Sequence, residues 1–444
     1  MFILRYIRRS DCAADDRDTD PEAATRLVPR TRARDRLLHA ASEVAAHEGY
    51  ALLTVERVLL AAGVSRATFY QYFTNIEDCF WSAYRQHSER LVSDVTAAVR
   101  GAERRDLAML DALVDAAISR PDVARLLMTE GLAGGQIGLA ERDALVAAIE
   151  RAVDAPAGGR SAVDIPEAIL IGGVFRFLSM RLADGGALDG VREEVREWAG
   201  AFGRSSPEHS WAARFMPVLP SSSDAPVSAR AVRQRGTSRE RILCATAASV
   251  REKGYRAMTV SDIVEGAGVS RRLFYNEFPS KSAAFMAAFE DIFQRTIAAC
   301  TPAFFSSRGW PERVWQSALA FTNFVSREPL LAYLGFVECY AIGPSFAARV
   351  HDTQLAFALF LEEGYRQRPE AASLPRSCAA LTVAAIVETG FLGSRRGVSL
   401  HLRRLQPLAV YVALTPFIGT DEAGRFVTGK LAVQAPAVPS GGLS

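Results

Sequence analysis

The chain has 444 residues, which at about 150 residues per domain suggests roughly two to four domains, and each half is long enough to bury a core. Its composition, with 49% hydrophobic and 23% charged residues, is that of an ordinary globular protein and excludes a largely disordered chain. A net charge of +2 excludes a strongly basic nucleic-acid-binding protein, so any basic surface must be local.

The chain shows no pattern typical of membrane insertion or export. Residues 1–9 lack the apolar core of a secretory signal, and no apolar run reaches the roughly 18 residues of a membrane span. We therefore expect a cytoplasmic protein without membrane contact. Residues 1–29, dominated by Asp, Ala, Thr and Arg without periodicity, are predicted to form a disordered leader.

The cysteines and histidines do not suggest a metal site. The six cysteines include no Cys-x-x-Cys pair, and the six histidines have no metal-ligand spacing, so we expect reduced thiols. No nucleophile and base can be assembled into a catalytic set. The sequence therefore predicts a protein that is not an enzyme and needs neither a metal nor a cofactor.

A helix-turn-helix pattern is predicted over residues 30–95. Arginines at alternate positions between residues 30 and 36 form a basic arm that suits phosphate contact. A helix follows over 35–48, because its apolar residues recur at helical spacing, and Gly49 would end it. Thr54 would then cap a second helix through its side-chain oxygen.

A tight turn separates the second helix from a short third one. Gly63 permits a left-handed backbone, and Ser65 immediately caps the third helix. Val64, Phe69 and Phe73 have the spacing of an inward face and are predicted to be core.

The other face of the third helix would meet a nucleic acid. A recognition helix enters the major groove with residues near its N-terminus at the base edges, where arginine can pair guanine and asparagine or glutamine can pair adenine. The positive end of the helix dipole also favours a nearby phosphate. This face presents Arg66, Ala67, Thr68, Tyr70 and Gln71.

Residues 96–203 are interpreted as a first, longer helical domain. Two helices are predicted near its end, over 167–182 and 191–202, joined by a short turn. The glycine-rich stretch 131–138 follows an apparent helix rather than a strand, so it is interpreted as an interhelical loop and not as a dinucleotide-binding loop.

The helix-turn-helix pattern returns over residues 236–300, after a linker at 204–235 rich in serine and proline. Matching residues of the two copies are 205 positions apart, without a gap, as for Gly49 and Gly254. Other matched pairs are Tyr50 and Tyr255, Thr54 and Thr259, Gly63 and Gly268, Ser65 and Ser270, Arg66 and Arg271, Phe69 and Phe274, Tyr70 and Tyr275, and Phe73 and Phe278. An internal repeat of this kind indicates two similar units in one chain.

The second copy keeps the scaffold and changes the exposed face. A second basic arm, from Arg230 to Arg241 and including Arg239, precedes a helix predicted over 239–253. The exposed face of the third helix presents Arg271, Arg272, Leu273, Tyr275 and Asn276. The positions that differ between the copies are Ala67 and Arg272, Thr68 and Leu273, and Gln71 and Asn276.

Residues 301–435 are interpreted as a second helical domain, with a disordered tail over 436–444. Helices are predicted over 378–391 and 400–417, with a turn at 393–397. Aromatic residues are much more frequent here than in the first helical domain, which favours either an aromatic-lined cavity for an apolar ligand or a plain aromatic core. Four polar residues lie among the aromatics and would either orient a ligand or face solvent: Glu338, Cys339, His351 and Gln354.

The repeated motif resembles the DNA-binding domain of TetR-family bacterial transcriptional regulators. The resemblance rests on Thr-Val, six further residues, Ala-Gly-Val-Ser, then Phe-Tyr and Phe, and it covers about 31–95 and 236–300. It implies an all-α fold of two tandem units, each with a three-helix DNA-binding domain followed by a helical ligand-binding and dimerisation domain. No membrane partner is implied.

The resemblance also implies which residues meet DNA. In the family, the recognition-helix tyrosine usually contacts a phosphate, and a lysine soon after the last aromatic residue commonly does the same. The second copy keeps this lysine as Lys281, whereas the first has Ile76 in its place. The residues expected at DNA are Arg34, Thr54, Ser65, Arg66, Ala67, Thr68, Tyr70, Gln71, Arg239, Thr259, Ser270, Arg271, Arg272, Leu273, Tyr275, Asn276 and Lys281.

The function implied is control of transcription at a double-stranded DNA operator, most simply as a repressor that an unknown small-molecule effector releases. Because the copies differ where sequence would be read, we expect two unlike half-sites. Two alternatives stay open: one copy has drifted and binds DNA weakly, or the protein acts by protein association and one or both copies no longer bind DNA.

The last two helices of each half resemble those through which family members dimerise as a four-helix bundle. Two such elements in one chain would pair either with each other, as an intramolecular pseudo-dimer, or with a second chain, as a homodimer. The linker is long enough for the first arrangement, because a flexible chain of n residues spans about 5–6 Å × √n.

Overall fold

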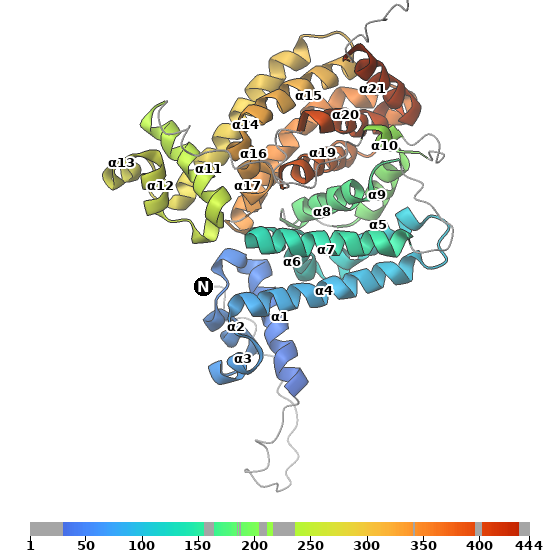
Figure 1. Cartoon of the computed structure of the whole chain (residues 1–444). Coiled ribbons are helices and arrows are strands. Elements are labelled where there is room, and N and C mark those ends of the chain that lie inside the picture. Colours follow the sequence, from blue (N-terminus) through green and yellow to red (C-terminus); the bar gives the residue numbers. More distant parts are fainter. Residues whose placement is uncertain are drawn as a thin grey trace, which may run out of the picture.

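The computed structural model describes residues 30–154, 164–183, 185, 188–203, 211–215, 236–340, 342–395 and 402–434. Over these ranges it consists of helices and their connections, without strands, which confirms the predicted all-α class (Figure 1). The predicted leader at 1–29 and the tail from 436 lie outside the described residues.

The first half of the chain runs from α1 to α10. Its elements are α1 (Arg30–Glu48), η1 (Tyr50–Leu52), α2 (Val55–Ala62), α3 (Arg66–Tyr72), α4 (Ile76–Val99), α5 (Arg105–Ser119), α6 (Pro121–Met128), η2 (Glu130–Gly134), α7 (Gly135–Asp154), α8 (Glu167–Ala183), α9 (Val191–Gly200) and α10 (Trp211–Phe215).

The second half runs from α11 to α21. Its elements are α11 (Ser238–Ala257), α12 (Val260–Ala267), α13 (Arg271–Glu277), α14 (Lys281–Phe305), α15 (Trp310–Arg327), α16 (Pro329–Phe336), η4 (Glu338–Tyr340), α17 (Pro344–Leu355), η5 (Ala356–Phe360), η6 (Glu362–Arg366), α18 (Pro369–Ala372), α19 (Ser377–Arg395), α20 (Leu402–Ile418) and α21 (Thr420–Gln434).

The helix-turn-helix repeat appears in the structure with matching lengths. Helices α2 and α12 have eight residues each, and α3 and α13 have seven each. The two units lie on the same side of the molecule, at the left of Figure 1, with α12 and α13 above α2 and α3. The longer helices of both halves form the body beside them.

The predicted start of the first helix was wrong. The basic arm of the first copy is not an arm, because α1 begins at Arg30 and the arginines at alternate positions lie within it. This follows from the high helix propensity of arginine and alanine. In the second copy, α11 begins at Ser238, and the arginines at 230, 233 and 235 lie outside the described residues.

The glycine-rich stretch 131–138 is not a loop. Its first part lies in η2, and α7 begins at Gly135. Gly138 and Leu139 are buried, and Gly138 lies beside the ring of Trp81 in α4. Burial against α4 outweighs the helix cost of glycine, which is about 1 kcal/mol per residue.

The helices near the end of each half also differ from the predicted elements. The first part of the turn expected at 393–397 is helical instead, because α19 continues to Arg395. The expected linker contains the short helix α10, whose first backbone N–H donates to Asp164 Oδ2 at 2.9 Å. Phe215 of α10 packs against Tyr411 of α20, so this part of the linker belongs to the body of the molecule.

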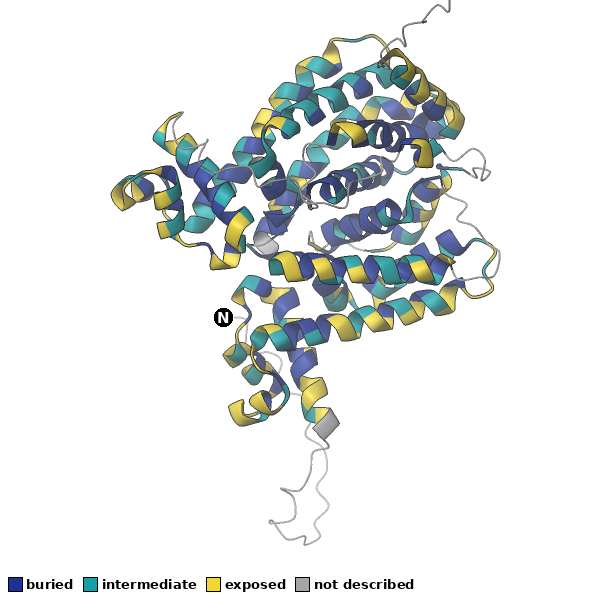
Figure 2. Ribbon diagram, in the orientation of Figure 1, coloured by how far each residue is buried: buried dark blue, intermediate teal, exposed yellow. Residues whose placement is uncertain are grey.

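The centre of the molecule is the crossing of α8 and α19, which are buried along most of their length (Figure 2). A Cβ on Gly172 of α8 would come within 2.3 Å of the Glu388 side chain, so this position requires glycine for the close approach. Residues Ser377–Ser394 of α19 are long and apolar enough to cross a membrane, but 72% of this segment is buried inside the protein. We therefore interpret α19 as a core helix.

Candidate nucleic-acid interface

The turn before the third helix has the same geometry in both copies. Gly63 and Gly268 have φ angles of 60° and 62°, in the left-handed region that glycine adopts without strain. Ser65 and Ser270 each accept a hydrogen bond from the backbone N–H three residues later, at 3.1 Å. The glycine turn and the serine cap fix the direction of α3 and α13, as the sequence predicted.

The second helix is capped more completely in the second copy. Thr54 accepts a hydrogen bond from the N–H of Arg57 at 3.4 Å. Thr259 accepts one from Asp262 at 3.2 Å, and Asp262 in return accepts the N–H of Thr259 at 2.8 Å, which completes a capping box. Lys253 and these hydrogen bonds lower the pKa of Asp262 to about 2.

The inward face of the third helix is core in both copies, as predicted. Phe69 and Phe274 are fully buried, and each packs against the next aromatic of its motif, Phe73 or Phe278. Arg34 lies over the ring of Phe73 and Arg239 over that of Phe278, at 5.8 and 4.7 Å from the ring centroids. Both arginines therefore sit exposed at the edge of their unit.

The outward face is free for a partner. Tyr70 and Tyr275 are 52% and 55% exposed, although each is a large ring, and each has an edge-on contact with the buried phenylalanine before it. Of the other face residues, Thr68 and Leu273 are half-buried and the following are exposed: Arg66, Ala67, Gln71, Arg271, Arg272 and Asn276. Figure 2 shows the exposed surface of α3 and α13. Contact of these residues with DNA stays a prediction.

The equivalent arginines Arg66 and Arg271 have different partners, which the sequence analysis missed. Arg66 forms an ion pair with Glu56 in the first turn of α2. Ser261 stands at the equivalent place in α12, and Arg271 donates to its hydroxyl at 2.6 Å. A comparison of the aligned positions outside α3 and α13 would have found this difference. At the start of the third helix, the first copy therefore presents less uncompensated positive charge than the second.

Lys281 is engaged within its own unit. Its Nζ donates to the backbone carbonyls of Tyr255, Arg256 and Met258, at 3.1, 3.2 and 2.9 Å. Partial burial lowers the pKa of this ammonium group. In this structure Lys281 therefore stabilises the bent end of α11, and the phosphate contact expected of it stays a prediction.

A buried glutamate ties each helix-turn-helix unit to the body of the molecule. Glu130 in η2 accepts the backbone N–H of Tyr50 at 2.7 Å, and Glu338 in η4 accepts the backbone N–H of Tyr255. Burial raises the pKa of each carboxyl group to about 7. The two glutamates are 208 positions apart rather than 205, so a search in the register of the motif does not pair them.

The two helix-turn-helix units also touch each other. Arg256 of the second unit lies 4.9 Å from the ring centroid of Tyr50 in the first and 3.5 Å from the carboxylate of Glu77. Leu132 and Leu139 of the first half pack into the same hydrophobic cluster as the core of the second unit. These contacts give α3 and α13 a defined relative position.

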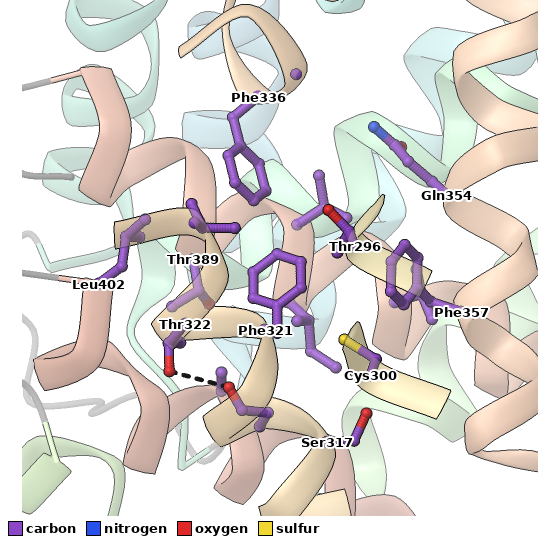
Figure 3. A pocket seen from close by; sticks show the side chains of 18 of the residues that line it. Thr296, Cys300, Ser317, Phe321, Thr322, Phe336, Gln354, Phe357, Thr389 and Leu402 are labelled. Carbon is purple, nitrogen blue, oxygen red and sulfur yellow. Dashed lines mark hydrogen bonds between the residues drawn. The ribbon is translucent and has the colours of Figure 1, made fainter. Parts of the chain in front are cut away.

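An apolar cavity of about 200 Å³ lies in the second half (Figure 3). It is lined from α14, α15, α16, α17, η5, α19 and α20. Several aromatic residues of the predicted second helical domain contribute, among them Phe321, Phe336, Phe357 and Phe360. Of the four polar residues noted with them, Gln354 lines the cavity, whereas Glu338, Cys339 and His351 are buried elsewhere.

Comparisons with known proteins agree with this geometry. The family described as "Bacterial regulatory proteins, tetR family" matches twice, at 37–82 and 242–288. The chain is 31% identical over 123 residues to the HTH-type transcriptional regulator EthR of Mycolicibacterium smegmatis, which covers 27% of this chain and 56% of that protein. It is 36% identical over 73 residues to the HTH-type transcriptional activator FasR of the same species, which covers 16% of this chain and 33% of that protein.

These matches span about half and about one third of the two relatives. TetR-family regulators are DNA-binding transcriptional regulators. The two matches to this family coincide with the two helix-turn-helix units of the structure, α1 to α3 and α11 to α13. The chain therefore carries the DNA-binding domain of the TetR family twice.

Proposed function

We propose that the protein is a sequence-specific DNA-binding transcriptional regulator that reads two unlike half-sites with one chain. The supporting observation is the contrast within the repeat: the turns and caps that aim α3 and α13 match, whereas the exposed side chains Arg272 and Asn276 replace Ala67 and Gln71. Residues at the N-terminus of a recognition helix read base edges, so this contrast favours an asymmetric operator.

In this proposal, the second helix-turn-helix copy makes the stronger contact with DNA. Arg271 and Arg272 leave two positive charges at the start of α13, whereas Glu56 offsets the charge of Arg66 at α3. Phosphate contacts dominate the affinity of DNA-binding proteins and increase with positive charge. The first copy then adds specificity more than affinity.

The two units act as an intramolecular pseudo-dimer in this proposal. Support comes from α8 and α19, which pack across the two halves. Glu388 of α19 pairs with Arg142 of α7 and Arg176 of α8 at 2.8 and 2.9 Å. Trp198 of α9 also donates to Thr382 of α19 at 3.1 Å. The spacing of α3 and α13 would then be a property of one chain.

An effector in the cavity would act on the second helix-turn-helix unit through η4. Gln354 lines the cavity and forms a hydrogen bond with Tyr340 of η4. Glu338 of the same turn accepts the N–H of Tyr255 at the hinge before α12. Tyr340 also accepts from Arg176 of the first half at 3.2 Å. A ligand that shifts η4 would change the spacing of the recognition helices.

We propose that this change releases DNA, so that the protein is a repressor in the absence of effector. A ligand can shift the equilibrium only if it binds the two arrangements with different affinity. The role needs no catalysis and places the protein in the cytoplasm with the chromosome. The name of the relative FasR describes an activator, so the direction of control needs a transcription assay with and without ligand.

The experiment that tests DNA binding is its salt dependence. Fluorescence anisotropy of the full chain with a selected DNA fragment should show log K falling steeply with log salt, because several phosphates are neutralised. Tyr70→Phe and Tyr275→Phe should each weaken binding to all sequences alike, as expected for phosphate contacts. A flat salt dependence would favour the protein-association alternative.

A further inference from the structure

The wall of the cavity in the second half carries no formal charge. Its lining consists of aliphatic and aromatic side chains, hydroxyl groups, one cysteine and two glutamines, without Asp, Glu, Lys, Arg or His. A charged ligand group placed there would lose its hydration without gaining an opposite charge. The cavity therefore selects against carboxylates, phosphates and ammonium groups.

The hydroxyl groups of three buried threonines in the wall are already used as donors. Thr296, Thr322 and Thr389 each donate to the backbone carbonyl one turn earlier in their own helix, at 2.6, 3.0 and 3.0 Å. Their oxygen atoms have no further proton to donate but keep lone pairs that can accept a hydrogen bond. Figure 3 shows these three side chains around the cavity.

Two glutamine side chains of the wall differ from these hydroxyl groups, because each has a polar atom without a hydrogen-bond partner among the described residues. Gln354 of α17 is 7% exposed and Gln406 of α20 is 4% exposed. Within the part of the chain that the structure describes, the Oε1 of Gln354 and the Nε2 of Gln406 are buried without a hydrogen-bond partner. Each such group costs free energy in the ligand-free protein. Buried amides of this kind are typical of a site that a ligand completes.

The free atoms define the chemistry of that ligand. Because the other amide group of Gln354 is engaged with Tyr340, its Oε1 needs a donor from the ligand. The Nε2 of Gln406 needs an acceptor. The volume of about 200 Å³ exceeds the roughly 150 Å³ of an engineered cavity that holds benzene, which suits on the order of ten non-hydrogen atoms.

We propose that the effector is an uncharged, largely apolar molecule with one hydrogen-bond donor and one acceptor, of the class of primary amides and alcohols. This inference rests on the proposed regulatory role of the cavity and adds the chemical class of its ligand. Gln354 and Gln406 are the residues that determine specificity.

The test is calorimetric titration of the full chain at pH 7 with four probes of equal chain length: octanamide, octanol, octanoate and octylamine. Octanamide and octanol should bind with the highest affinity, because each supplies both a donor and an acceptor. Octanoate and octylamine, which are charged at pH 7, should bind at least about 100-fold more weakly. Equal binding of octanoate and octanamide would overturn the proposal, and so would the absence of octanamide binding.

Two substitutions assign the preference to the glutamines. Gln354→Leu and Gln406→Leu should each weaken octanamide binding about tenfold. Gln367→Leu is the matched control, because Gln367 is exposed and does not line the cavity. Since leucine removes an unpaired amide at nearly constant volume, Gln406→Leu should unfold without ligand at a temperature no lower than the parent. Unchanged octanamide affinity in both folded variants would contradict the assignment.

DNA affinity measured in the same samples separates this inference from the proposed function. If octanamide binds with the expected preference and DNA affinity stays constant, the ligand class is supported and the regulatory role of the cavity is wrong. Ala318→Phe, which places a ring in the cavity, should abolish octanamide binding. Retained binding in this variant would place the ligand elsewhere and overturn the proposal.

Discussion

At the residue scale, the contrast between the two recognition helices depends on few side chains. Arg272 is exposed at the N-terminal end of α13, where the first copy has Ala67. Arg66 and Arg271 are the same residue in both copies but have different partners, Glu56 and Ser261. Within the described ranges, the second copy therefore has two arginines without an acidic partner at the start of its third helix, and the first copy has none.

Arg272→Ala tests base reading directly. Because a bidentate arginine–guanine contact gives about 1–3 kcal/mol of discrimination, we expect relaxed sequence preference at one position of one half-site. The measurement is competition binding with operators mutated at single positions. Arg66→Ala is the comparison, since Glu56 already offsets its charge, and it should change affinity little and uniformly. An unchanged preference after Arg272→Ala would exclude Arg272 as a base-reading residue.

Individual residues also show which features of the fold and the candidate site could be predicted from the sequence. The glycine turn, the serine and threonine caps and the buried phenylalanines were predicted because they depend on neighbours within a few residues. The ion pair of Glu56 with Arg66 and the carbonyl contacts of Lys281 were not, because they join different helices. The spacing of a motif carries no information on such contacts.

At the element scale, the short helices η2 and η4 couple each helix-turn-helix unit to the body. Each supplies one buried glutamate to the backbone N–H of a tyrosine, Glu130 to Tyr50 and Glu338 to Tyr255. These contacts join residues 80 positions apart in the first copy and 83 in the second, so the sequence motif did not reveal them. The stretch read as a loop at 131–138 is part of the first contact.

Glu338→Gln tests the protonation of this contact. Burial raises the pKa of Glu338 from 4.5 to about 7, so the folded state binds the proton more tightly than the unfolded state. The resulting stabilisation is fully present below pH 4.5 and is lost as pH rises to about 7, and it amounts to at most roughly 3 kcal/mol. Glutamine keeps an acceptor for the Tyr255 N–H without titrating.

We therefore expect the melting temperature of the parent to fall more between pH 5 and pH 7.5 than that of Glu338→Gln. Differential scanning fluorimetry at the two pH values measures both. The surface glutamate Glu370 offers a control, since Glu370→Gln should leave the pH dependence unchanged. Equal pH dependence in parent and Glu338→Gln would show that this carboxyl group titrates normally.

At the scale of the whole molecule, the two halves share one buried ion-pair cluster. Glu388 is fully buried between Arg142 and Arg176, which are each 3% exposed. The ring of Phe391 lies 4.7 and 5.0 Å from the two guanidinium groups. The sequence indicated two similar units, but the pairing of their last helices depends on contacts more than 200 positions apart, which no local pattern predicts.

Glu388→Ala should strongly destabilise the folded chain. Removal of the carboxylate leaves two buried guanidinium groups without their shared partner, which costs about 3–5 kcal/mol. The control is Glu194→Ala, which removes a half-exposed ion pair with Arg181 inside the first half and should cost at most about 1 kcal/mol. Urea unfolding followed by tryptophan fluorescence compares the two, and equal small effects would contradict a shared core between the halves.

The central claim is that one chain reads two unlike half-sites at a spacing fixed by its own fold. The most direct measurement is selection of the purified protein on random double-stranded DNA, with the enriched sequences examined for symmetry. We expect two different half-motifs at constant spacing, with the stronger conservation in the half-motif that Arg272→Ala relaxes. A palindrome would contradict it, because identical half-sites would mean that one copy reads DNA in a dimer of chains.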